Sequence, residues 1–472
     1  MPVALDLGLR GHFLELIGER LGKLFEGVDE LDEGVMGVGQ CETLSPWNPL
    51  RNGLLRVIMA SVPVLPIGIR ALNRTLRLLG GLTPYGRLLS SDRLHRLASK
   101  QTGLMDFGSP SYRVGFDKLL GSLNEEARLT PLGRLIATEE VLTALKNRLQ
   151  LEAHHQQYPD IGAAPIRRPI IMIGMGRSGT TILHELLALD PANRIPATWE
   201  VDMPFPAPEK STYDTDPRID IIQKRLDRTD SIIPDFKSIH RMGARLPQEC
   251  VRITTGEFAS MIFGCTYEVP SYSNWLLEEA DAAPAYDYHR RFLQLLQWKC
   301  PAERWVLKSP GHLWTLPQML AAYPDARLIQ THRDPLKTAS SLSSLITTLR
   351  AMGSDDVDPP AIAKQWIRWN TAGVNASARA RQEGLFTPDQ IIDVSFYEFM
   401  DAPLDQMERI YDFFEIELLP SVRTRMQDYL SVHTAEQHGV HHYDFHDFGL
   451  DLAEERERVR PYQEYFDVPA EI

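Results

Sequence analysis

Short apolar runs alternate along this chain with segments of helical periodicity. Ile170–Ile173 is a continuous apolar run between Pro169 and Gly174, which is typical of a strand buried in a parallel sheet. Similar runs lie within residues 305–308, 326–333 and 391–394, and helical spacing of apolar residues marks 181–187, 313–323 and 336–349. This alternation predicts an α/β fold with a central parallel sheet flanked by helices, related in plan to nucleotide kinases.

Three regions are predicted along the chain. Residues 1–164 form a mostly helical N-terminal region, which would supply an acceptor-side or dimer surface. Residues 165–430 form the α/β core with a helical insertion at about 202–299, and residues 431–472 form a tail or lid. The insertion contains aromatic residues that either line an acceptor pocket or belong to the core: Phe258, Phe263, Tyr267, Tyr272 and Trp275. The tail is rich in histidine: His433, His438, His441, His442 and His446.

A glycine-rich turn follows the first apolar run. It carries one arginine and several hydroxyls in the sequence Gly176, Arg177, Ser178, Gly179, Thr180 and Thr181. Because a predicted helix follows, the free backbone N–H groups and the positive end of the helix dipole would converge on an anion here. The turn therefore predicts a phosphate cradle, and the alternative is an ordinary glycine-containing turn between a strand and a helix.

Three nucleotide-binding patterns compete for this turn. Gly174, Gly176 and Gly179 fit the dinucleotide pattern G-x-G-x-x-G, while residues 174–181 approach a Walker A loop. A Walker loop needs lysine where this chain has Thr180, and its only cation is Arg177 inside the loop. A dinucleotide loop would carry more apolar residues around its third glycine. The many donors of this turn instead favour a compact, multiply charged group.

Two later strand-like runs each end in a cation. Lys308 closes one run and Arg333 follows the next, with a helical segment between them. A parallel arrangement would place both cations at the carboxyl edge of the sheet, where open α/β sheets bind ligands. Ser341 falls in the second turn of the following helix, from which it could share an anion with Arg333.

Taken together, these segments resemble the sulfotransferase superfamily that uses 3′-phosphoadenosine 5′-phosphosulfate (PAPS), in the bacterial branch related to tyrosylprotein sulfotransferases. The resemblance implies that residues 176–181 hold the 5′-phosphosulfate and that Arg333 and Ser341 hold the 3′-phosphate. It also implies that Lys308 lies near the bridging oxygen and Tyr397 near the adenine. PAPS would be the donor, adenosine 3′,5′-bisphosphate (PAP) the product, and no metal would be required.

An acceptor hydroxyl needs a base, and three residues compete for this role. Glu200, in the segment after the first core helix, ranks first because related enzymes place a catalytic glutamate there and Trp199 could raise its basicity. His240 and Glu249 rank second and third. The alternative for Glu200 is a structural glutamate that orders Arg177 or caps a helix. In sulfuryl transfer, Lys308 and Arg177 would stabilise the charge that develops on the donor.

The composition limits the remaining choices. The chain has 472 residues and a formal net charge of −13, which argues against general nucleic-acid binding. Its four cysteines are too scattered for a disulfide framework or a zinc site. The first ten residues lack the pattern of a secretory signal, so we expect a cytoplasmic protein. The apolar residues 57–69 are too short to span a bilayer, and they predict either peripheral membrane contact or a buried helix pair.

The sequence therefore predicts transfer of a sulfuryl group to a hydroxyl of an apolar small-molecule or lipid acceptor. A nucleotide kinase would share the loop and the sheet, but it would need the Walker lysine and a carboxylate for Mg²⁺ at a strand end. A PAPS-binding protein without catalysis would keep the loops and tolerate replacement of Glu200 and Lys308.

Overall fold

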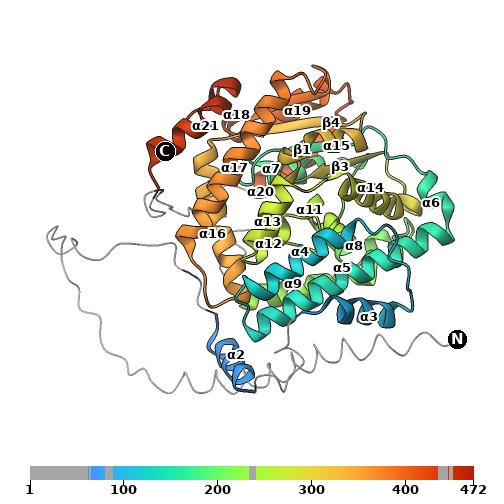
Figure 1. Ribbon diagram of the computed structural model, residues 1–472. Coiled ribbons are helices and arrows are strands. Elements are labelled where there is room, and N and C mark those ends of the chain that lie inside the picture. Colours follow the sequence, from blue (N-terminus) through green and yellow to red (C-terminus); the bar gives the residue numbers. More distant parts are fainter. Residues whose placement is uncertain (1–61, 63–64, 80–88, 233–240, 434–444, 446–449) are drawn as a thin grey trace, which may run out of the picture.

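A computed structural model describes the chain except residues 1–61, 63–64, 80–88, 233–240, 434–444 and 446–449. Its centre is a five-stranded sheet in the order β2-β3-β1-β4-β5, in which all neighbours pair in parallel (Figure 1). The strands are β1 (Ile170–Ile173), β2 (Asn193–Arg194), β3 (Arg304–Lys308), β4 (Arg327–His332) and β5 (Ile391–Ser395). The predicted α/β class is confirmed, and β1 has the predicted bounds.

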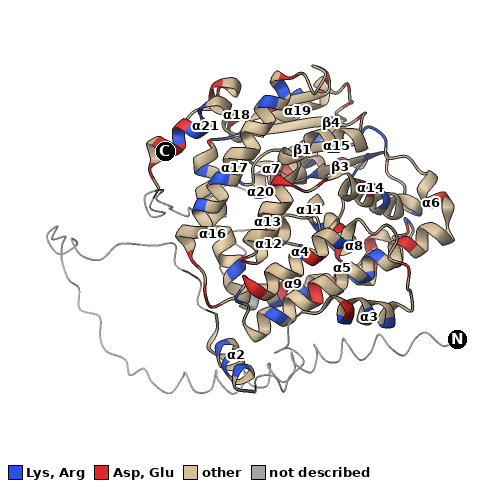
Figure 2. Cartoon of the chain, viewed as in Figure 1, with Lys and Arg blue, Asp and Glu red and all other residues tan. Residues whose placement is uncertain are grey.

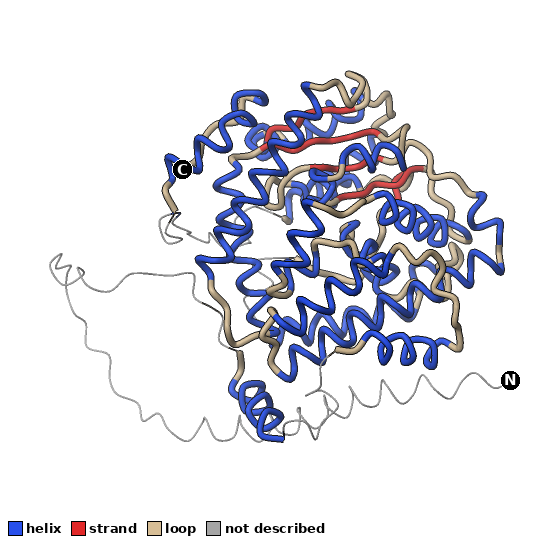
Figure 3. The backbone as a smooth tube through the Cα atoms, in the orientation of Figure 1, coloured by secondary structure: helices blue, strands red, loops and turns tan. Residues whose placement is uncertain are grey.

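Alternate residues of β1 enter two different hydrophobic cores, because successive side chains of a strand point to opposite faces. Ile170 and Met172 pack on one face, whereas Ile171 and Ile173 pack on the other. The helices that contribute to the first core are α7 (Thr180–Leu187), α18 (Phe396–Asp401), α19 (Pro403–Phe413) and α20 (Pro420–Val432). Those of the second core include α14 (Ala283–Trp298), α15 (Leu316–Ala322), α17 (Pro359–Gln382) and α21 (Leu452–Phe466). The sheet is thus covered on both faces, as Figure 3 shows.

A helical layer lies beside this α/β core in the lower part of Figure 1. Its N-terminal helices are α2 (Ile67–Leu79), α3 (Ser91–Thr102), α4 (Tyr112–Glu125), α5 (Pro131–Gln157) and α6 (Pro159–Ala163). The segment between β2 and β3 adds α8 (Thr198–Asp202), η3 (Tyr213–Thr215), α9 (Pro217–Ile232), α11 (Cys250–Ile253), η4 (Thr254–Glu257), α12 (Ile262–Thr266) and α13 (Pro270–Glu278). The long segment between β2 and β3 is therefore helical.

Four of the five aromatic residues expected at the acceptor pocket are fully buried in this helical layer. Phe258, Phe263, Tyr267 and Tyr272 share one hydrophobic core with α3, α4 and α5, and Trp275 packs against its edge. Of the two alternatives for these aromatic residues, the structure matches the core and not the pocket wall, and burial of large aromatic groups between helices is energetically favourable. The N-terminal helices and the insertion are thus joined by a common core.

Two long helices connect the layers. In α16 (Pro335–Gly353), Leu336 and Ala339 pack with α17 and α21, while Ile346 packs with the tryptophans of α17. A short helix, η5 (Pro310–Trp314), follows β3 and leads into α15. The single helix expected over residues 313–323 is therefore two shorter elements, and Pro317 lies at the start of the second.

Most of the apolar stretch 57–69 lies outside the described residues, as does the histidine-rich segment apart from His433. Leu65 and Ile69 are buried against Leu132 and neighbouring apolar side chains, whereas Ile67 is exposed. Helix α2 contains basic residues and no acidic residue (Figure 2), and its Arg77 forms an ion pair with Asp355. Among the helices of the described part of the chain, none is long and apolar enough to cross a membrane.

Candidate active site

The glycine-rich turn joins the centre of the sheet to α7. Gly174 has φ = 146° and Gly179, the residue before α7, has φ = 85°, so both adopt backbone conformations that favour glycine. A Cβ atom on Gly174 would lie 2.2 Å from Oγ1 of Thr331 in β4. The turn therefore passes against the neighbouring strand at a distance that only glycine permits, with the start of α7 at the carboxyl edge of the sheet.

Internal hydrogen bonds hold this turn in place. Oγ of Ser178, which is buried, donates to the carbonyl oxygen of Met175 at 2.6 Å and lies 2.7 Å from Oγ1 of Thr331. Thr180 is also buried, whereas Arg177 and Thr181 are exposed. Ser178 thus stabilises the turn itself, and the exposed side chains of Arg177 and Thr181 are the ones available to a ligand.

The two predicted anion sites are in direct contact. Nη1 of Arg333 donates to the carbonyl oxygen of Arg177 at 3.0 Å, and Nε of Arg177 donates to Oγ of Ser341 at 3.0 Å. The guanidinium of Arg333 also stacks on Phe396, with 3.9 Å between its central carbon and the ring centroid. Residues that lie more than 150 positions apart in the chain therefore form one basic surface at the ends of β1, β4 and β5.

A glutamate near the end of the sequence, Glu471, also lies in this surface. Its carboxylate accepts hydrogen bonds from Nε and Nη2 of Arg333 at 2.7 and 3.0 Å, and from the hydroxyl of Tyr397 at 2.9 Å. Burial alone would raise the pKa of Glu471, but the Arg333 guanidinium outweighs it and lowers that pKa. Burial and the nearby Glu471 carboxylate raise the pKa of Tyr397 to about 12. No motif in the sequence pointed to Glu471.

Lys308 ends β3 next to the glycine-rich turn. It is buried, with Nζ 2.8 Å from Oε1 of Glu249 and 3.3 Å from Oγ1 of Thr181. The pairing of β1 with β3, in which Met172 lies beside Lys308, determines this position. Three polar groups therefore meet at one point: the ammonium of Lys308 from β3, the carboxylate of Glu249 before α11, and the hydroxyl of Thr181 from the glycine-rich turn.

A small polar cavity surrounds this point. Its walls come from α7, from β3 and from the segment before α11: Thr181, His184, Glu185, Arg241, Leu246, Pro247, Gln248, Glu249 and Lys308. Burial, and then the charge of Lys308, lower the pKa of His184 to about 3, so its imidazole is neutral and a weak base near pH 7. Among the titratable side chains that line this cavity, Glu249 is the carboxylate in contact with Lys308.

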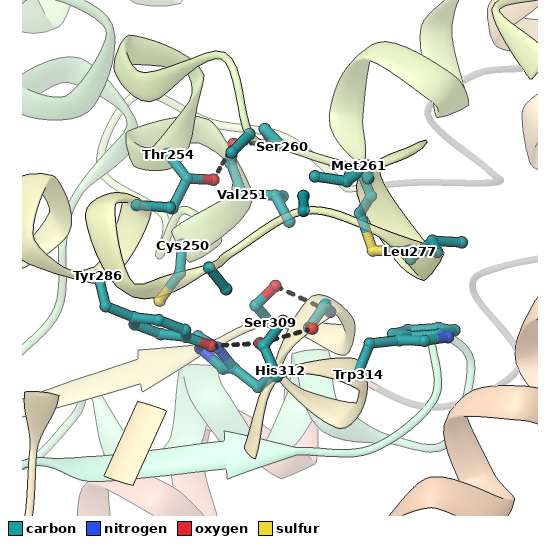
Figure 4. Close-up of a pocket in the computed structure, with 17 residues that line it drawn as sticks. Cys250, Val251, Thr254, Ser260, Met261, Leu277, Tyr286, Ser309, His312 and Trp314 are labelled. Atoms are coloured by element: carbon teal, nitrogen blue, oxygen red, sulfur yellow. Dashed lines mark hydrogen bonds between the residues drawn. The ribbon is translucent and has the colours of Figure 1, made fainter. Parts of the chain in front are cut away.

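Figure 4 shows a larger, apolar cavity. It spans about 570 Å³, a volume that includes space open to solvent, and Cys250 and Ser309, the chain neighbours of Glu249 and Lys308, belong to its wall. Tyr286 lies in this wall with its hydroxyl 2.7 Å from Nδ1 of His312 and 2.7 Å from Oγ1 of Thr315. The remaining wall is largely aliphatic or aromatic and includes Val251, Met261, Leu276, Leu277, Ala282, Ala285 and Trp314. Burial lowers the pKa of His312 to about 4, so this wall is uncharged at neutral pH.

The structure places Glu200 away from both cavities. Its side chain is fully buried, with Oε2 2.8 Å from Nη2 of Arg194 and Oε1 accepting hydrogen bonds from the backbone of Ala197 and from Tyr213. These contacts match the alternative interpretation of Glu200 as a structural residue, although its partner is Arg194 and not Arg177. His240 lies outside the described residues.

A metal site and a reactive cysteine each place requirements on side chains in the described part of the chain. Within the described residues, no group of three or more histidine, cysteine, aspartate or glutamate side chains has a geometry suited to a metal ion. Burial raises the pKa of the Cys250 thiol to about 12, so that thiol stays protonated at neutral pH.

Comparisons with known proteins show which family the chain resembles. A model of the sulfotransferase family matches residues 169–420. Sulfotransferase STF9 from Mycobacterium avium superposes with a TM-score of 0.75 and 28% identity, over 82% of this chain and 100% of the other. Sulfotransferase STF1 from Mycobacterium tuberculosis gives a TM-score of 0.68 and 30% identity, over 79% and 98% of the two chains.

A curated relative adds a named activity. Omega-hydroxy-beta-dihydromenaquinone-9 sulfotransferase Stf3 from Mycobacterium bovis is 23% identical over 282 residues, which span 56% of this chain and 67% of the relative. The predicted family is confirmed, because the family model covers more than half of the chain and includes every strand of the sheet. The chain belongs to the sulfotransferase family and is a sulfotransferase.

Proposed function

We propose that this protein transfers a sulfuryl group from PAPS to the hydroxyl of an apolar small-molecule or lipid acceptor. The observation that carries this proposal is that Arg333 and Ser341, the residues predicted to hold one anion, both contact Arg177 of the turn predicted to hold the other, with Lys308 beside that turn. PAPS carries two separate anionic groups, a 3′-phosphate and a 5′-phosphosulfate, and so needs two such clusters. Backbone N–H groups at the start of α7 favour the 5′ group because they are free and lie at the positive end of the helix dipole.

The role of Lys308 follows from the chemistry. During sulfuryl transfer the bond between sulfur and the bridging oxygen breaks, and negative charge grows on the 5′-phosphate that leaves as part of PAP. A buried ammonium beside the donor loop would stabilise that charge, and one well-placed donor of this kind is worth on the order of 10² to 10³ in rate. Arg177 would stabilise the negative charge on the equatorial oxygens of the transferred sulfuryl group.

Glu249 is the base that we propose, in place of the first-ranked Glu200. A general base must reach the acceptor hydroxyl. Glu249 lines the polar cavity and its chain neighbour Cys250 lines the apolar one, while Glu200 is enclosed by protein. Donor binding would draw Lys308 toward the bridging oxygen, and the Glu249 carboxylate would then take the acceptor proton. The acceptor oxygen would then attack sulfur as the proton moves to Glu249.

The apolar cavity supports an apolar acceptor. Its wall would take up a hydrocarbon or ring system and leave the hydroxyl near Glu249 and Lys308, because burial of apolar surface is favourable by about 25 cal/mol per Å². The menaquinone-derived lipid in the name of the relative Stf3 is an acceptor of this general kind.

Incubation of the purified protein with ³⁵S-labelled PAPS tests this proposal. The panel of acceptors should hold phenols, sterols and long-chain alcohols, with monosaccharides as polar controls. We expect label to move to one or more apolar acceptors and not to the sugars. Donor binding without transfer to any acceptor would favour the inactive PAPS-binding protein, and tighter binding of ATP than of PAP would favour the kinase.

A further inference from the structure

The segment after α21 turns back to the basic surface of the proposed donor site. The carboxylate of Glu471 accepts two parallel hydrogen bonds, of 2.7 and 3.0 Å, from the guanidinium of Arg333. Arginine also binds a phosphate in this geometry. Tyr397 donates a third hydrogen bond to the same carboxylate at 2.9 Å. An anion of the protein itself therefore occupies the position expected for the 3′-phosphate.

Arg333 cannot hold Glu471 and a phosphate in this way at once. Its Nε and Nη2 donors are used by Glu471, its Nη1 donates to the carbonyl oxygen of Arg177, and one face of its plane is covered by Phe396. A phosphate that binds the Nε and Nη2 side of the fork must take the place of the carboxylate.

The segment is also anchored outside this subsite. The backbone N–H of Glu471 donates to Oδ2 of Asp334 at 2.7 Å. Both oxygens of Asp334 accept hydrogen bonds from Arg456 of α21, and Arg456 also donates to the carbonyl oxygen of Ile472 at 2.7 Å. Asp334 is fully buried at the start of α16, next to Arg333. The Glu471 carboxylate is thus held at the subsite by contacts that do not themselves involve a ligand.

We propose that Glu471 is an internal competitor of the 3′-phosphate of the donor, so that binding of PAPS or PAP displaces Glu471 from Arg333. This inference rests on the proposed function. A phosphate carries more negative charge and one more acceptor oxygen than a carboxylate, so the nucleotide replaces Glu471 on Arg333. Its affinity is reduced by the free energy needed to displace Glu471. Only nucleotides with a 3′-phosphate meet this competition, because Glu471 makes no hydrogen bond to the glycine-rich turn in the described contacts.

Calorimetric titration of PAP into the full chain tests the inference. The Glu471→Gln variant keeps the size of the side chain but removes its charge, and we expect it to bind PAP about tenfold more tightly than the original protein. The matched control is Glu464→Gln on the exposed side of α21, where the Glu464 carboxylate lies 3.9 Å from Arg460. This variant should bind PAP with unchanged affinity. Adenosine 5′-phosphosulfate, which lacks the 3′-phosphate, should bind the original protein and Glu471→Gln equally well.

Hydrogen exchange provides a readout that is independent of affinity. The backbone N–H of Glu471 is hydrogen-bonded in the described structure, and we expect faster exchange of residues 467–472 when PAP is bound. Equal or weaker binding of PAP by Glu471→Gln would overturn the inference and leave the proposed donor intact. The same tightening with adenosine 5′-phosphosulfate would also overturn it, because the competition would then not concern the 3′-phosphate. If neither protein binds PAP, the proposed function and the inference fall together.

Discussion

At the scale of single residues, the two candidate glutamates differ in their surroundings. Glu249 is partly exposed at a cavity and contacts the Lys308 ammonium, whereas Glu200 is fully buried and contacts Arg194. A carboxylate that accepts a proton from a substrate needs access to it, while a buried ion pair contributes chiefly to folding. Substitution of each glutamate by glutamine should therefore change different properties of the protein.

Glu249→Gln should lower kcat on the order of 10²-fold or more without weakening the binding of PAP, because it removes proton acceptance and not donor contacts. Glu200→Gln should lower the free energy of unfolding by about 3 kcal/mol, since it leaves the buried Arg194 without a counter-charge. Steady-state kinetics and urea unfolding of both variants separate these effects. Full turnover by Glu249→Gln would return the search for the base to Glu200 and His240.

At the scale of elements, the donor loop depends on the close approach between β1 and β4. Gly174→Ala would place a Cβ atom 2.2 Å from Thr331 Oγ1 in a backbone conformation unfavourable for alanine. We expect a loss of about 1 to 3 kcal/mol in the free energy of unfolding, together with weaker binding of PAP. Urea unfolding and titration with PAP measure the two effects.

Gly176→Ala in the same turn is the matched control for folding. A Cβ atom there would meet only Cδ1 of Leu342, at an ordinary contact distance of 3.8 Å. Its unfolding should resemble that of the original protein. Equal destabilisation by the two alanines would show that the Thr331 contact is not what restricts the loop.

The elements of the core were largely predictable, and those of the insertion were not. Residues 170–173 have no polar position and a glycine at their end, so their local pattern alone indicates a buried strand. The strand β2 has only two residues, too few to show a period, and it forms because it pairs with β3. The aromatic residues of the insertion carry no mark that separates a pocket wall from a core, because both are apolar.

At the scale of the whole molecule, the wall of the apolar cavity is formed by residues of both the insertion and the α/β core. Ala282 lies in its wall, whereas the adjacent Ala283 is exposed and outside it. Ala282→Phe should raise KM for the acceptor identified with labelled PAPS and leave PAP binding unchanged, because the ring would fill space needed by the acceptor. Ala283→Phe, with the same change in volume, should leave both values unaltered. Equal kinetics for the two variants would place the acceptor elsewhere.

Buried neutral histidines should make the stability of the whole molecule depend on pH. Burial lowers the pKa of His289 from 6.5 to about 3, so the folded state stays unprotonated where the unfolded chain binds a proton. The free energy of unfolding should therefore fall as the pH drops below about 6.5, by about 1.4 kcal/mol from this group between pH 7.5 and 5.5. His184 and His312 should add effects of the same sign.

Urea unfolding at the two pH values measures this change in stability. Glutamine at position 289 cannot titrate but can still form a hydrogen bond to the Tyr323 hydroxyl, which lies 2.7 Å from His289. The change between pH 7.5 and 5.5 should therefore be smaller in His289→Gln. An unchanged pH dependence would contradict a neutral His289 in the folded state.

The sequence by itself determined the α/β class, the central strand, the glycine-rich turn and the family, because these features depend on residues that are neighbours in the chain. It also predicted that Lys308, Arg333 and Ser341 lie near one edge of the sheet, because the carboxyl ends of parallel strands meet there. Only the tertiary structure decided that Glu249 lies against Lys308, that Glu200 is enclosed with Arg194, and that Glu471 occupies the fork of Arg333. Glu249 and Glu471 lie 59 and 138 residues from their partners. Local periodicity carries no information on such pairs, since packing of the insertion and of α21 against the core brings them together.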